Sequence, residues 1–98
     1  MILNKSVNGA TATIAVVGRL DTQTAPELEK ELDTTFAGLQ NLTFDMSGLE
    51  YISSAGLRVI LKAQKVMNKQ GSMKLTCVND SIMEVFEITG FLDILTIE

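Results

Sequence analysis

The chain has 98 residues, the length of one domain, and 46% of them are apolar, which is enough for a single buried core. It has no histidine and one cysteine, Cys77, which excludes histidine-ligated metal sites, histidine-dependent catalytic triads and an intrachain disulfide. Eight basic residues against twelve acidic ones give a net charge of −4, and their scatter excludes the basic footprint that direct nucleic-acid binding needs.

No apolar run approaches the ~18 residues of a membrane span, and the first five residues lack the charged and apolar segments of a signal peptide. We therefore expect one domain over residues 1–98, located in the cytoplasm and without membrane insertion. Cys77 lies in an alternating apolar run, which predicts a buried thiol.

The first half of the chain predicts a β-hairpin and then a helix. Asn8-Gly9 separates the strand-like runs Ile2–Val7 and Thr11–Val17, and this dipeptide suits a tight hairpin turn. Thr24 can cap the helix and Glu27 can complete a capping box with it, while Gly38 marks the end. The apolar residues between these signals recur at helical spacing: Leu28, Leu32 and Phe36.

The second half predicts two strands, two helices and an ambiguous tail. Residues 42–46 and 73–77 alternate as half-buried strands, whereas Ser47–Ile52 carries turn residues and predicts a loop. The longest helix is expected from Ser53 or Ser54 to Gln70, and a shorter one follows the possible caps at residues 79–81 and ends at Gly90. The tail, Phe91–Glu98, suits either a last short strand or a docked turn.

The predicted element order is β-β-α-β-α-β-α, with an optional last strand. Strand–helix–strand units joined by short loops imply parallel pairing after the initial hairpin. We therefore expect an α/β sandwich, in which a mixed sheet of four to five strands begins with a β-hairpin and helices pack against it.

No common catalytic or cofactor motif occurs in the sequence. Neither a P-loop nor a dinucleotide fingerprint is present, and Ser54 does not fit the nucleophile elbow of serine hydrolases. We expect no cofactor, no metal and no enzymatic activity. A small enzyme or nucleotide binder that uses Asp21, Asp45 and Ser54 is the least favoured hypothesis.

Two adjacent serines and a glycine stand where the longest helix is expected to begin. From the residues alone, Ser53 is an N-cap, Ser54 a first-turn residue and Gly56 a small residue for close packing. The start of a helix also tolerates negative charge, so a phosphate on either serine would be accommodated there. The sequence leaves open which of Leu57, Arg58 and Leu61 faces outward beside these serines.

Residues Asp45–Leu61, with the core Ser53-Ser54-Ala55-Gly56-Leu57, resemble the signature of STAS domains, and specifically of bacterial anti-sigma factor antagonists. Gly18-Arg19-Leu20-Asp21 is similar to the G-x-L-D pattern of the same family. The element order and the chain length agree as well, so the resemblance covers the whole chain.

The resemblance implies a phosphorylation switch that regulates transcription indirectly. The unphosphorylated protein would bind an anti-sigma factor that is also a serine kinase, and a metal-dependent serine phosphatase would restore it after phosphorylation. By position, the acceptor falls on Ser54. Ser53 is the second candidate, because well-known members have an aspartate where this chain has Ser53.

The same resemblance implies a partner surface around the acceptor. A STAS accessory subunit of a transport or signalling complex, never phosphorylated, is the alternative function. The residues expected at the partner surface are Asp21, Asp45, Ser53, Ser54, Gly56, Leu57 and Arg58.

Overall fold

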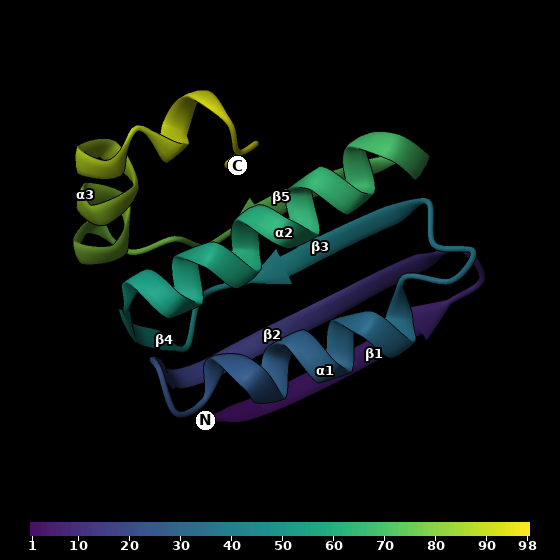
Figure 1. The fold of residues 1–98 in the computed structure, drawn as a ribbon, viewed down its shortest axis with the longest axis horizontal. Helices are drawn as coiled ribbons and strands as arrows, with labels where there is room; N and C mark the ends of the chain where they lie inside the picture. Colours follow the sequence, from purple (N-terminus) through teal and green to yellow (C-terminus); the bar gives the residue numbers. More distant parts are fainter.

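The computed structural model describes residues 1–98 and contains five strands, three α-helices and one 3-10 turn (Figure 1). The strands form one mixed sheet and the helices lie against it or at its end. In chain order the elements are β1 (Ile2–Asn8), β2 (Thr11–Leu20), α1 (Ala25–Thr35), β3 (Asn41–Asp45), β4 (Leu49–Ile52), α2 (Ser54–Gln70), β5 (Ser72–Thr76), α3 (Asp80–Thr89) and η1 (Phe91–Asp93).

The sheet has the order β1-β2-β3-β5, with β1 antiparallel to β2 and the remaining pairs parallel. The long strand β2 pairs with two parallel strands. Its first half pairs with β3, and its last residues, 18–20, pair with β4. The register shifts after Gly18, whose φ of +101° suits glycine. The expected α/β class and the mixed sheet that begins with a hairpin are both confirmed.

One face of the sheet is covered by α1 and α2, which lie side by side and run along the direction of the strands (Figure 1). Strict alternation produces this arrangement, because every second residue of β2 and β3 points toward the helices. Helix α3 lies beyond the carboxyl end of β3 and contacts β4. The largest fully buried side chains include Ile14, Phe44, Leu28, Ile60 and Phe86.

The structure corrects two expectations about local elements. Residues 49–52 form strand β4 rather than a loop. Strand β5 ends at Thr76, and Cys77 is exposed with a φ of +57°, so the prediction of a buried thiol is wrong. The alternation of the preceding strand does not extend to Cys77 because the chain turns there toward α3.

The tail combines both of the structures left open for it. Phe91–Asp93 forms a 3-10 turn, and Ile97 then makes a single parallel bridge to Leu75 of β5. Leu95 is buried between these two points, which attaches the tail to the core. No helix in the chain has both the length and the apolar character needed to cross a membrane.

Candidate functional site

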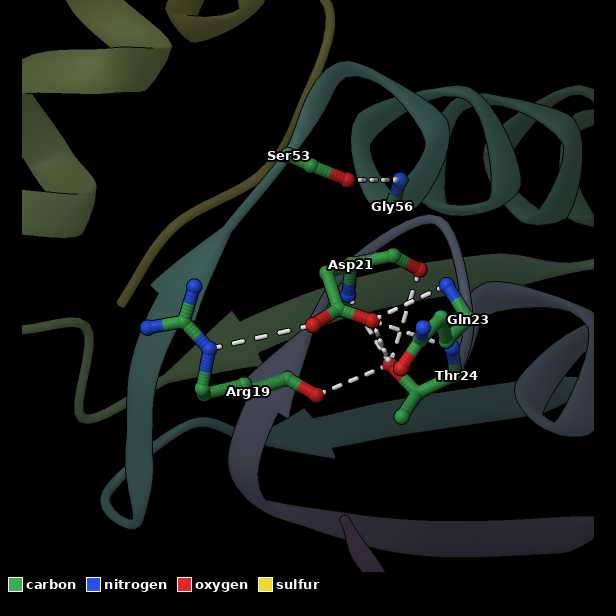
Figure 2. A network of polar contacts seen from close by, with 6 residues as sticks. All are labelled: Arg19, Asp21, Gln23, Thr24, Ser53 and Gly56. Carbon is green, nitrogen blue, oxygen red and sulfur yellow. Dashed lines mark hydrogen bonds and ion pairs between the residues drawn. The ribbon is translucent and has the colours of Figure 1, made fainter.

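Ser53 and Ser54 lie where β4 joins α2. Figure 2 shows Ser53 beside the loop that follows β2. Ile52 at the end of β4 pairs with Leu20 at the end of β2. The backbone N–H of Ser53 then donates to the carbonyl oxygen of Leu20 over 2.9 Å. The first turn of α2 is therefore attached to the β2–α1 loop, which begins at Asp21.

The two serines have different roles at the start of α2. Ser53 has an extended backbone, and its Oγ accepts a long hydrogen bond of 3.4 Å from the backbone N–H of Gly56. Ser53 is thus the N-cap, as the residues predicted. Ser54 is the first helical residue, its side chain is exposed, and it makes no side-chain hydrogen bond within the chain. Its hydroxyl is free to react or to meet a partner.

Gly56 allows this turn to pack closely on the strands. It is buried, and a Cβ at this position would lie 2.7 Å from Leu20 Cγ, 2.9 Å from the Leu20 carbonyl oxygen and 3.0 Å from Ile52 Cγ1. No side chain fits there without moving the end of β2. Gly56 therefore contributes to the site by packing rather than by direct contact with a partner.

The β2–α1 loop below the serines is organised by Asp21 (Figure 2). Its Oδ1 accepts hydrogen bonds from the backbone N–H groups of Gln23, at 3.0 Å, and Thr24, at 3.1 Å. Thr24 Oγ1 in turn accepts from the Asp21 backbone N–H and donates to the carbonyl oxygen of Arg19, both at 2.8 Å. Hydrogen bonds among Arg19, Asp21, Gln23 and Thr24 thus fix the conformation of the loop.

This loop corrects the expected start of α1. Thr24 occupies the N-cap position but its side chain caps nothing in the helix, and no capping box with Glu27 forms. Its hydroxyl is already engaged by the Arg19 carbonyl and the Asp21 backbone N–H. The carboxylate of Asp21 accepts hydrogen bonds from the backbone N–H groups of Gln23 and Thr24 instead, which makes this loop an Asx turn.

The ionised form of Asp21 is favoured by its surroundings. The backbone N–H of Thr24, then that of Gln23, lowers the pKa of the Asp21 carboxyl below its ordinary value, and the Arg19 guanidinium, 3.7 Å away, adds to the effect. Arg19 also stacks over the ring of Tyr51 in β4, 4.2 Å from its centroid. Arg19 and Tyr51 are part of the site that the sequence did not single out, although Arg19 lies inside the G-x-L-D pattern.

We predict a specific pH dependence for Asp21→Asn. Because folding lowers the pKa of this carboxyl, its contribution to stability is fully present above the unfolded value of about 3.9 and is lost as the pH falls through the lower folded value. The parent protein should therefore exceed the variant in unfolding free energy at pH 7, and the difference should shrink toward pH 2. Urea titrations at several pH values measure this; a difference that stays constant or grows in acid contradicts it.

The structure shows which residues of the first two turns of α2 face outward. Leu57 is buried, Leu61 is half-buried and Arg58 is exposed. A shallow apolar hollow of about 280 Å³ lies between this side of α2 and the chain that follows α3. The residues that line it are Ser54, Leu57, Arg58, Leu61, Thr89 and Phe91.

Asp45 is not joined to the rest of the site. It alternates with the buried Phe44, so its side chain lies on the sheet face away from the helices. Its Oδ1 accepts a hydrogen bond of 2.9 Å from the backbone N–H of Ser47, which lowers the pKa of the Asp45 carboxyl. No hydrogen bond or ion pair connects it to Asp21 or Ser54. The structure thus brings together Asp21, Ser53 and Ser54 and leaves Asp45 in a separate turn.

Comparison with known proteins places this geometry in a family. Residues 3–98, nearly the whole chain, match the STAS domain. The Bacillus subtilis anti-sigma-B factor antagonist is 31% identical over 85 residues, which cover 86% of this chain and 78% of that protein. This chain belongs to the STAS family of anti-sigma factor antagonists. BtrV of Bordetella bronchiseptica, provisionally named an anti-sigma factor antagonist, is 40% identical over 79 residues, 79% of this chain and 68% of that protein.

Solved structures show that this STAS domain has the fold of its relatives. The anti-sigma factor antagonist SpoIIAA in its unphosphorylated form superposes with a TM-score of 0.79 at 15% identity, over 99% of this chain and 87% of that one. The phosphorylated form of SpoIIAA from Bacillus gives 0.78 at 16%, over 99% and 91%. These relatives are named as antagonists of anti-sigma factors.

Proposed function

We propose that this STAS domain binds an anti-sigma factor while Ser54 is unmodified, and that phosphorylation of Ser54 ends this binding. The proposal adds to the family membership a specific acceptor residue, Ser54, and a specific chemical switch, its phosphorylation. The anti-sigma factor would be the serine kinase, and a metal-dependent serine phosphatase would restore the binding form.

The observation that supports the proposal is that Ser53 and Ser54 have different structural roles. The Ser53 hydroxyl accepts the capping hydrogen bond from Gly56, whereas the Ser54 hydroxyl is exposed and unbonded within the chain. A kinase can approach Ser54 without opening the helix. To phosphorylate Ser53 it would have to disrupt the cap, which is worth about 1 kcal/mol.

The serine at position 53 is compatible with this switch. Aspartate and serine are both good N-cap residues, so either one can begin the helix at this position. Serine there preserves the start of α2 while it removes one negative charge beside the acceptor. The neutral Ser53 side chain changes the charge that a kinase contacts beside the acceptor, and it leaves the position of Ser54 unchanged.

The switch chemistry requires one transfer in each direction. In the kinase step the Ser54 Oγ forms a bond to the γ-phosphorus of ATP, the bond to the β–γ bridging oxygen breaks, and ADP and the hydroxyl proton leave. In the phosphatase step water replaces Ser54 Oγ on phosphorus, which regenerates the serine and releases inorganic phosphate. This chain supplies only the acceptor hydroxyl.

A phosphate at this position would act on the interface rather than on the fold. It adds a charge of about −1.5 to −2 and three acceptor oxygens, which the N-terminus of α2 tolerates. A partner packed against a neutral hydroxyl would instead face desolvation and charge repulsion. A loss of about 3–4 kcal/mol of binding free energy corresponds to a complex about 100- to 1,000-fold weaker.

Phosphopeptide mapping tests the residue assignment. We expect the cognate anti-sigma kinase with ATP to label the parent chain on Ser54 alone, to label Ser53→Asp on Ser54 as well, and to leave Ser54→Ala unlabelled. Ser53→Asp is the matched control, because aspartate keeps the N-cap and removes the neighbouring hydroxyl. Phosphate found on Ser53 contradicts the assignment of the acceptor to Ser54. No labelling by a kinase that binds the chain contradicts the switch itself and favours the permanent accessory-subunit alternative.

A further inference from the structure

The two arginines of the chain differ in whether their guanidinium groups have partners. Arg19 is engaged by the Asp21 carboxylate and by the ring of Tyr51. Arg58, on the second turn of α2, is exposed and takes part in none of the ion pairs or side-chain hydrogen bonds of the protein. A guanidinium without a partner is available to bind an anion.

Arg58 lies on the same side of α2 as the proposed phosphoacceptor. It follows Ser54 by four residues, and residues with this spacing are neighbours on a helix, with Cβ atoms about 5–6 Å apart. Long side chains on a helix point back toward its N-terminus, which directs the guanidinium toward Ser54. Both residues line the apolar hollow described above, so they share one piece of surface.

No acidic side chain of the protein forms an ion pair with Arg58. The first turn of α2 contains no acidic residue. Glu29 of α1 shares a shallow depression with Arg58, but its carboxylate is 3.6 Å from the Nζ of Lys62. A phosphate on Ser54 would be an unpaired anion that lines the same hollow as Arg58.

We propose that Arg58 binds the phosphate on Ser54 within the same chain. This inference rests on the proposed function, since it assumes that Ser54 is the residue modified. The planar guanidinium can donate two parallel hydrogen bonds to phosphate oxygens, a geometry that lysine cannot reproduce. Arg58 is therefore a positioning residue for the modified state, and it fixes the phosphate over the start of α2.

The pair also changes what the partner meets. In the unmodified chain the surface beside Ser54 carries the single positive charge of Arg58, which suits an acidic group on the anti-sigma factor. A phosphate of about −1.5 to −2 charges changes this local sum from +1 to about −0.5 to −1. Phosphorylation would thus both add a negative charge and withdraw the cation that attracts the partner.

The test uses phosphoserine incorporated at position 54 during translation, so it needs no kinase. Phosphorus NMR follows the second ionisation of the phosphate in the otherwise native chain, in Arg58→Gln and in Lys65→Gln. Lys65→Gln is the matched control, because Lys65 is an exposed cation of α2 outside the ion pairs. We expect the phosphate of the native chain and of Lys65→Gln to titrate at the same pH, and that of Arg58→Gln at a clearly higher pH.

The same samples give a second readout by thermal melting. The gain in melting temperature on phosphorylation should be smaller in Arg58→Gln than in Lys65→Gln, and Arg58→Lys should be intermediate in both measurements. Equal titration of the phosphate in Arg58→Gln and Lys65→Gln overturns the proposal. A kinase that ignores Ser54 overturns the proposed function instead and leaves these titrations unchanged, so the two failures are distinguishable.

Discussion

Gly56→Leu should destabilise this domain by about 3 kcal/mol or more, as judged by urea unfolding. Even a Cβ would lie 2.7 Å from Leu20 Cγ and 2.9 Å from the Leu20 carbonyl oxygen, and backbone cannot move away cheaply. Overpacking of a core typically costs about 1–3 kcal/mol, and leucine adds three carbons beyond the Cβ. The better helix propensity of leucine offsets less than about 1 kcal/mol of this cost.

Two variants of the same turn control for this result. Gly56→Ala should be intermediate, because alanine introduces the Cβ clash alone while it gains about 1 kcal/mol of helix propensity. Ser54→Ala removes an exposed hydroxyl and should change stability by less than about 0.5 kcal/mol. If Gly56→Leu unfolds at the same urea concentration as the parent, α2 does not depend on close contact with Leu20.

Ser54→Asp should leave the fold intact and weaken binding to the anti-sigma factor, so that stability and affinity change independently. A carboxylate at the start of α2 is favoured by about 0.3–1 kcal/mol in the free protein, so any loss of affinity arises at the interface. One carboxylate carries less charge than a phosphate, and the effect should therefore be smaller than that of phosphorylation. Calorimetric titration paired with a thermal melt measures both quantities.

Ser54→Asn separates charge from size in this experiment. Asparagine has nearly the shape of aspartate but no charge, so it should bind close to the parent, and Ser54→Ala should bind at least as well as the parent. If Asn and Asp weaken binding equally, steric exclusion rather than charge controls the interface. If Ser54→Asp binds as tightly as Ser54→Ala, charge at this position is irrelevant to the partner.

The elements that the sequence predicted well are those whose signals are local. Asn8-Gly9 and the alternating residues on each side of it predicted the hairpin. The long helix α2 begins after the cap Ser53 and ends before the helix-breaking Gly71, as predicted. Strand β4 was missed because Glu50 and Tyr51 are adjacent exposed residues, which breaks the alternation expected of a strand. That strand exists because β2 continues past Gly18 and offers it a partner.

The candidate site was predictable only in part. Ser53 as the N-cap follows from residues that are neighbours in the sequence, whereas the attachment of this turn to Leu20 depends on the pairing of β4 with β2. Helical periodicity left the outward face of α2 open, and the structure settles that Leu57 is buried and Arg58 exposed. The resemblance grouped Asp45 with Asp21, but the two lie in separate turns because β3 ends at Asp45 opposite Ala15, whereas β2 continues to Leu20.

The most direct test of the account is the affinity of one cognate anti-sigma factor for two forms of this chain, measured by calorimetric titration. One form is unmodified and the other carries phosphate on Ser54 alone, with thermal melts to show that both are folded. We predict tight binding of the unmodified form and binding about 100- to 1,000-fold weaker for the phosphorylated form, which corresponds to about 3–4 kcal/mol. Equal affinity of the two folded forms would contradict the switch and leave a permanent complex as the function of this domain.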